Sequence, residues 1–256
     1  MNNNLLQSVA ENAVYVAEFA AIILAMFLIA YFFEKLAKKR SGDTERVLTT
    51  RKVAVIGVFS AIAVILHIFD FPVPFAPGFY KLDFSEIPVL IGAFAFGPVA
   101  GVMTEFIKIL LKLVIKGTST AFVGDLANFV VGCSFILPAS IIYHFKKTRM
   151  NAILACVVGT ITITICGTLL NAVYLLPAFA ALYGTPMENL IAAGTAINPR
   201  ITDVTSFVIL AVAPMNLLKG FLVSLVDILV YKKLSPVLKG TTAVTRRDAD
   251  TAKANA

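Results

Sequence analysis

Seven apolar segments, several of them long enough to cross a lipid bilayer, limit what this chain can fold into. A spanning helix needs about 18 to 20 mostly apolar residues, because each residue adds about 1.5 Å to its length. Only 14% of the residues are charged, against about 25% in soluble domains. We therefore predict an all-α polytopic membrane protein. The apolar segments are residues 14–33, 53–68, 87–96, 99–115, 122–145, 151–182 and 204–231.

The first segment, residues 14–33, is predicted to be a membrane helix and not a signal peptide. It has neither a basic region before it nor a small-residue cleavage site after it, and a signal peptide carries both. Composition divides the chain into an N-terminal transmembrane helix (1–40), a basic linker (41–52), a membrane domain (53–239) and a disordered tail (240–256).

Lysine and arginine alternate between rich and poor connectors, and this pattern predicts the orientation. By the positive-inside rule, the rich connectors lie in the cytoplasm. Seven crossings then place the N-terminus outside and the C-terminus in the cytoplasm of a bacterial plasma membrane. The net charge of +7 follows this topology and does not predict nucleic-acid binding. The rich connectors are 34–52, 146–149 and 232–239, and the poor ones carry only Lys81, Lys116 and Arg200.

The sequence FDFPVPFAPGFYKLDFSE, residues 69–86, alternates prolines with aromatic residues. Proline removes a backbone donor and clashes with the preceding turn, so this segment cannot be a regular helix. One interpretation is an aromatic belt at the membrane interface. The other is a semi-rigid lid that offers flat apolar faces to a planar ligand.

Lys219 lies near the centre of the last apolar segment, within PMNLLKG. A charge at mid-depth costs about 2.5–3.5 kcal/mol on the insertion scale. The spacing places it on one helix face with Asn216 and Asp227, and Thr168 and Asn171 share a face of the preceding helix. Lys219 therefore either pairs with a carboxylate, such as Glu105 or Asp125, or contacts a ligand.

The remaining polar residues of the membrane segments receive structural interpretations. Glu105, Lys108 and Lys112 have the spacing of intrahelical ion pairs, and His67 and His144 are interpreted as interfacial side chains. The three cysteines lie singly in apolar segments and have no metal-ligand spacing. No nucleophile elbow, zinc-binding helix motif or P-loop is present. The chain is thus predicted to be neither an enzyme nor an ATPase.

Four sequence blocks resemble a known family. They are KLDFSEIPVLIGAFAFGPVAGVMTEFIKILLKLVIKGT (81–118), GDLANFVVG (124–132), LLNAVYLLPAF (169–179) and PMNLLKG (214–220). They are similar to the riboflavin-specific substrate-binding (S) components of energy-coupling-factor (ECF) vitamin transporters. The resemblance implies a six-helix S component in residues 53–239. Such a component captures riboflavin, as substrate and not as cofactor, and works with a transmembrane T component and two cytoplasmic ATPases.

The resemblance also implies roles for individual residues. Asn171 and Lys219 are expected to contact the flavin ring system. Gly57 and Ala61 match the small residues through which the family docks its T component. The full substrate-binding set that we predict is Asn171, Lys219, Asn216, Asn128, Tyr80, Leu82, Asp83, Phe84, Tyr174 and Thr168.

Two departures from the family leave alternatives open. The N-terminal helix, residues 14–33, is an extra span that offers a docking site for another membrane protein. The connector 183–203 is longer than expected and would change the lid. The alternatives are an S component for FMN or another vitamin, and an accessory membrane subunit without a transport role.

Overall fold

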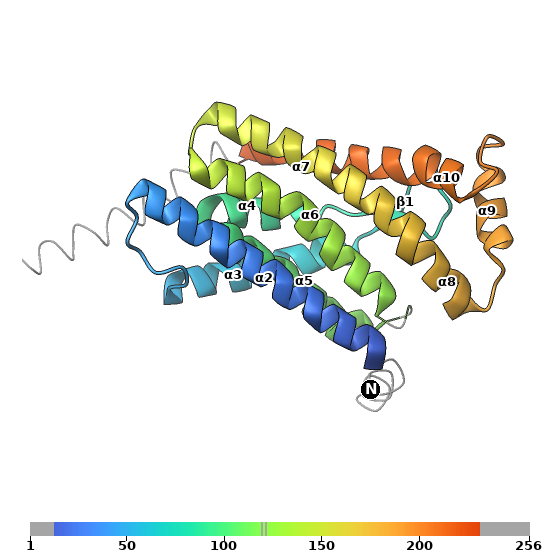
Figure 1. The fold of residues 1–256 in the computed structure, drawn as a ribbon, viewed down its shortest axis with the longest axis horizontal. Coiled ribbons are helices and arrows are strands. Elements are labelled where there is room, and N and C mark those ends of the chain that lie inside the picture. The colour runs from blue at the N-terminus through green and yellow to red at the C-terminus, as the bar shows by residue number, and fades with distance from the viewer. Residues whose placement is uncertain (1–12, 119, 121, 231–256) are drawn as a thin grey trace, which may run out of the picture.

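The computed structural model describes residues 13–118, 120 and 122–230. Its long helices lie side by side as a bundle, and successive helices run in opposite directions along it (Figure 1). This all-helical membrane fold confirms the predicted fold class. The predictions for the tail 240–256 and for Lys232, Lys233 and Lys239 lie outside the described residues.

The helices follow the predicted apolar segments closely. Their ends differ from the predicted ends by only a few residues, except that the first helix continues through the basic residues to Ser41. The helices are α2 (Ala13–Ser41), α3 (Thr50–Ile68), α4 (Glu86–Phe96), α5 (Pro98–Lys116), α6 (Val123–Phe145), α7 (Arg149–Leu170), α8 (Leu176–Tyr183), α9 (Met187–Thr195) and α10 (Val204–Phe207), with π-helical turns η1 (Asn171–Leu175) and η2 (Val208–Val212) and a last helix over residues 213–230.

Five helical stretches of the described chain are long and apolar enough to cross a membrane. Two more predicted crossings do not meet that criterion. Helix α5 has 19 residues but carries four charged side chains, and α4 has only 11 residues. The count of six core helices plus one therefore stays a prediction. The five stretches are 19–41, 50–68, 123–145, 149–183 and 204–230.

The π-helical turns interrupt the last two membrane helices just before prolines. Turn η1 ends two residues before Pro177, and η2 ends two residues before Pro214. Proline has no N–H to donate, so the carbonyl one turn earlier loses its helical partner. Single π-helical turns often occur at functional sites. The sequence showed that Pro214 breaks the last apolar run, but it did not reveal a π-helical turn at either place.

Helix α2 packs on α5 and α6 as an integral part of the bundle (Figure 1). Phe27 meets Phe106 of α5 edge-on, with ring centroids 6.0 Å apart. The buried Glu34 carboxylate accepts a hydrogen bond from the backbone N–H of Val99, 3.0 Å away, at the start of α5. Gly97 makes room for it, because a Cβ there would lie 2.5 Å from a carboxylate oxygen. Glu34 thus caps α5.

The aromatic segment, residues 69–85, is folded into the bundle and is not a regular helix. It forms two short antiparallel strands, β1 (Phe71–Pro72) and β2 (Lys81–Leu82). Its buried side chains, Val73, Ala76, Tyr80 and Leu82, share one apolar core with residues of α8, α10 and η2. Helix α9, which the sequence did not predict within the connector 183–203, packs against the same core.

The connectors gather at two opposite ends of the bundle (Figure 1). The loop end holds the aromatic segment and the connector 184–203. The basic end holds 42–49 and 146–148, which meet around a cavity of about 90 Å³. Of the three connectors predicted to be basic, the two that the structure describes share one end, and the third, 232–239, lies outside the described residues. Residues that line the cavity include Glu34, Lys38, Arg51, Lys52, His144 and Lys147.

Candidate ligand-binding site

Tyr80 joins the aromatic segment to the π-helical turn of the α7–α8 helix. Its hydroxyl donates to Asn171 Oδ1 at 2.6 Å, and Asn171 Nδ2 donates to the carbonyl of Gly167 at 2.7 Å. Asn216 of the last helix approaches the same place, because a Cβ on Gly167 would lie 2.6 Å from its amide nitrogen. Burial raises the pKa of the Tyr80 hydroxyl, which therefore stays a donor. The aromatic segment, the α7–α8 helix and the last helix thus meet around the side-chain amides of Asn171 and Asn216.

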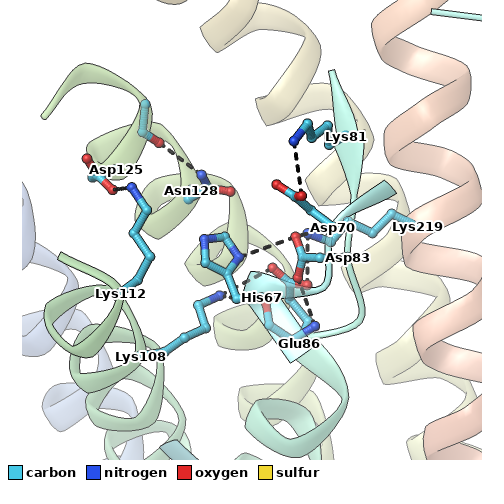
Figure 2. Close-up of polar contacts among 12 residues, drawn as sticks. His67, Asp70, Lys81, Asp83, Glu86, Lys108, Lys112, Asp125, Asn128 and Lys219 are labelled. Atoms are coloured by element: carbon cyan, nitrogen blue, oxygen red, sulfur yellow. Dashed lines mark hydrogen bonds and ion pairs between the residues drawn. The ribbon is translucent and has the colours of Figure 1, made fainter. Parts of the chain in front are cut away.

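Lys219 is buried beside these amides and is paired with two carboxylates. Its Nζ lies 3.1 Å from Asp83 Oδ2 and 2.8 Å from Glu86 Oε2. The partners suggested from the sequence, Glu105 and Asp125, are wrong. Both of those carboxylates are already paired with lysines of α5, and the true partners lie just before and at the start of α4 (Figure 2).

The ion pairs continue from Lys219 into α5. Glu86 Oε1 lies 3.5 Å from Lys108 Nζ, which also pairs with Glu105 and donates to Ser85 Oγ at 3.0 Å. The ion pair between Glu105 and Lys108 within α5 is the one that their spacing predicted. Lys112 instead pairs with Asp125 of α6, 2.6 Å away. The result is a buried chain of alternating charges: Glu105, Lys108, Glu86, Lys219 and Asp83.

His67 completes this chain and is not the isolated interfacial residue predicted. Its Nδ1 lies 3.4 Å from Asp83 Oδ2 (Figure 2). Burial alone raises the pKa of the Asp83 carboxyl, but Lys219 and His67 more than offset burial and hold that pKa well below its ordinary value. Asp83 is thus a carboxylate at neutral pH. His144 is also engaged, because its Nε2 lies 3.0 Å from the Ala93 carbonyl oxygen near the basic end.

The structure brings together most of the predicted substrate-binding residues, though not all of them. Leu82 and Phe84 pack in the same apolar core as Tyr80. Thr168, within one turn of Asn171, has a buried hydroxyl without a hydrogen-bond partner among the described residues. Tyr174 packs toward α6, and Asn128 donates to the Gly124 carbonyl of its own helix at 3.1 Å. These last two lie on the α6 side of the site.

Sequence reasoning missed Glu86, Ser85, Lys108 and His67 as parts of this cluster. Glu86 had a signal, because it follows Asp83 by three residues and opens an apolar helix. A carboxylate at that position is favoured by the helix dipole. The partner of Glu86 had no such signal, because Lys219 is 133 residues further along the chain.

The face of α3 that carries Gly57 and Ala61 is exposed. Both residues are exposed, and apart from its chain neighbours and its own helix backbone no described atom lies within 4 Å of a Cβ built on Gly57. The opposite face of α3 is buried. These small residues therefore do not serve packing inside the bundle. Exposed apolar neighbours, Val58, Ile62 and Ile65, continue the face.

Comparison with known proteins bears on this arrangement. The family model for the substrate-specific component of ECF transporters matches residues 51–231. The riboflavin transporter FmnP of Bacillus subtilis is 32% identical over 190 residues, which is 74% of this chain and 94% of the relative. The riboflavin transporter RibU of Staphylococcus aureus is 35% identical over 189 residues, which is 74% of this chain and 93% of the relative.

A solved structure supports the same comparison. It is described as the S component of a bacterial ECF transporter, is 35% identical and gives a TM-score of 0.58. The similarity covers 74% of this chain and 98% of that structure. The family match begins at residue 51, so α2 precedes the matched region.

Proposed function

Because the chain belongs to the substrate-specific (S) components of ECF transporters, we propose that it binds riboflavin and delivers it across the membrane. As a member of this family it is a multi-pass membrane transport component and not an enzyme. The binding side is proposed to be the loop end, facing outside, with the basic end in the cytoplasm.

The observation that carries the proposal is the convergence of Lys219, Asn171 and Asn216 beneath the aromatic segment. The polar edge of a flavin ring has carbonyl oxygens that accept hydrogen bonds and a ring N–H that donates one. An ammonium donor and amides that both donate and accept match that edge. Small-molecule sites commonly combine apolar walls with a few such groups.

Aromatic residues beside these polar groups supply flat surfaces for the ring. Phe79 stacks on Phe207 of α10 at a centroid distance of 6.5 Å, and Tyr80 lies 6.0 Å from Phe207. In this structure the Tyr80 hydroxyl donates a hydrogen bond to the Asn171 amide oxygen. We propose that the ligand replaces Tyr80 as the donor to that oxygen when it binds. The residues that we propose to line the site remain Asn171, Lys219, Asn216, Asn128, Tyr80, Leu82, Asp83, Phe84, Tyr174 and Thr168.

The charge of the site favours riboflavin over its phosphate ester, FMN. The buried chain around Lys219 holds three carboxylates, Asp83, Glu86 and Glu105, against two lysines. A phosphate dianion buried here would meet lysines that are both already paired, and an unpaired buried charge is strongly destabilising. Riboflavin carries no charge at neutral pH and avoids this cost.

The exposed face of α3 is the proposed docking surface for the T component, with two ATPases supplying energy from the cytoplasm. Small residues let helices approach closely in a membrane, and Gly57 and Ala61 present that surface outward. Helix α2 packs on α5 and α6. We propose that this arrangement leaves the α3 face open to the T component.

Titration of purified protein with riboflavin tests the proposal. We expect a yellow preparation with flavin absorbance, and quenching of riboflavin fluorescence when stripped protein is added. FMN should bind at least about tenfold more weakly. Burying its unpaired phosphate charge should cost at least about 1.4 kcal/mol of binding free energy, and that amount corresponds to a tenfold change in affinity. A colourless preparation that quenches neither flavin would instead support the accessory-subunit interpretation.

A further inference from the structure

Two carboxylates hold the Lys219 ammonium group, and the fold fixes them to different degrees. We propose that Glu86 is a positioning residue for Lys219, whereas Asp83 is the partner that gives way when a ligand binds. The inference rests on the proposed function, since it takes Lys219 to be a donor to bound riboflavin. It adds a residue, Glu86, that the sequence motifs did not place in the site.

Glu86 is fixed at both of its carboxylate oxygens. Oε2 lies 2.8 Å from Lys219 Nζ, and Oε1 lies 3.5 Å from Lys108 Nζ (Figure 2). The residue opens α4, a helix that is buried along nearly its whole length. The positive end of the helix dipole also favours a carboxylate at this position. The Glu86 carboxylate therefore cannot turn away from Lys219 without also losing its ion pair with Lys108.

Helix α5 supports Glu86 from the side away from Lys219. Lys108 is fully buried, pairs with Glu105 one turn earlier and donates to Ser85 Oγ at 3.0 Å. Gly132 of α6 leaves space for the Glu105 carboxylate, because a Cβ there would overlap it. Two packed helices thus fix the Lys108 ammonium group, which in turn fixes one oxygen of Glu86.

Asp83, unlike Glu86, lies between β2 and α4, outside any helix or strand. Its Oδ1 accepts from the backbone N–H of Ser85 at 2.8 Å, and its Oδ2 lies 3.1 Å from Lys219 Nζ and 3.4 Å from His67 Nδ1. Asp83 therefore keeps two partners, Ser85 and His67, when Lys219 turns to a ligand. This contact with Lys219 can be exchanged without breaking a hydrogen bond of α4 or of the last helix.

The two carboxylates should therefore affect ligand binding in opposite directions. A ligand carbonyl that accepts from Lys219 would take the place of Asp83 Oδ2. Glu86 would remain and balance the ammonium charge, which is costly to leave unpaired inside a membrane protein. Neutralising Asp83 removes a competitor of the ligand, whereas neutralising Glu86 removes the group that keeps Lys219 in place.

The test is a riboflavin fluorescence titration of isosteric variants, using monodisperse protein only. Glu86→Gln should weaken binding about 10- to 100-fold, the range expected when a charged hydrogen-bonding partner is lost. Asp83→Asn should tighten binding about two- to tenfold, because the amide oxygen would still accept from Ser85 but the side chain would no longer attract the ammonium group. Glu34→Gln, a buried carboxylate near the basic end, is the matched control and should leave the dissociation constant unchanged.

A double variant separates positioning from general damage. In a Lys219→Met background, Glu86→Gln should change the dissociation constant by less than about twofold, since coupled residues are not additive. Equal losses for Glu86→Gln and Asp83→Asn, or additive losses in the double variant, would overturn the proposal. If Glu86→Gln gives no monodisperse protein, Asp83→Asn decides alone, and weaker binding by that variant overturns it. Wild-type protein that binds no riboflavin refutes the proposed function itself.

Discussion

At the loop end, five charged groups from α4, α5, the last helix and the aromatic segment form one buried chain of alternating charge, which His67 of α3 completes. At the basic end, the lysines and arginines lie at the ends of helices and in the short connectors between them, and the buried Glu34 carboxylate accepts from one backbone N–H. The first arrangement joins many elements, and we propose that a ligand rearranges it. The second joins two helices and holds them together. The comparison thus sets a proposed binding role for buried charge at one end against a packing role at the other.

The largest expected effect would come from the α3 face, which belongs to neither arrangement. Gly57→Leu or Ala61→Leu should abolish riboflavin uptake by cells, because a bulky side chain prevents close approach of a partner helix. Riboflavin binding by the purified variants should match wild type. Normal uptake by both variants would remove this surface from the docking proposal.

Substitution of Lys219 addresses the loop end directly. Lys219→Ala should weaken riboflavin binding about 10- to 150-fold, because a hydrogen bond to a charged group contributes about 1.5–3 kcal/mol. The measurement is a fluorescence titration of monodisperse protein. If Lys219 were purely structural, its removal would lower the yield of folded protein while the folded fraction kept its affinity. That result would mean that buried charge has a packing role at both ends of the bundle.

Substitution of Asn171 should have a smaller effect of the same kind. Asn171→Ala removes a neutral hydrogen-bonding group, which contributes about 0.5–1.5 kcal/mol, so binding should weaken about 2- to 12-fold. Isothermal titration with riboflavin measures this change. Tyr80→Phe, which removes only the hydroxyl that occupies Asn171 Oδ1 in this structure, serves as the comparison and should bind at least as tightly as wild type.

The smallest effect on binding is expected at the basic end. Glu34→Ala leaves the first turn of α5 without its cap, which costs about 0.5–2 kcal/mol of stability. Its riboflavin affinity should equal that of wild type. Thermal unfolding in detergent, measured beside the titration, checks both statements. A tenfold loss of affinity without a loss of stability would show that the two ends are not separate in function.

The sequence predicted the elements of the fold well because the signal for a membrane helix is local. Apolar length gave α3, α4 and α6 to within a few residues, and the prolines of the aromatic segment excluded a helix there. The π-helical turn before Pro214 was not predicted, because the choice between a kink and a wider turn depends on what packs around it. Helix α9 was missed because its nine residues are too short for the apolar-length signal that identified the membrane helices.

The candidate site was predictable in its residues but not in its pairings. Lys219 stood out because a charge at mid-depth is expensive wherever it occurs. Its partners depend on where the aromatic segment folds back, and the spacing within a helix carries no information about that. Asp83 was assigned to the site by resemblance alone, and the structure shows that its carboxylate meets Lys219.

Glu34 also bears on how this protein can be shortened. Relatives cover the chain only in part, and the family match starts at residue 51, which invites experiments on a version trimmed to that boundary. Such a trimmed protein would lose the carboxylate seated over Gly97 and expose the apolar faces of α5 and α6 that α2 now covers. Poor behaviour of the trimmed protein in detergent would then reflect the cut itself, and would say nothing about the intrinsic robustness of the family core.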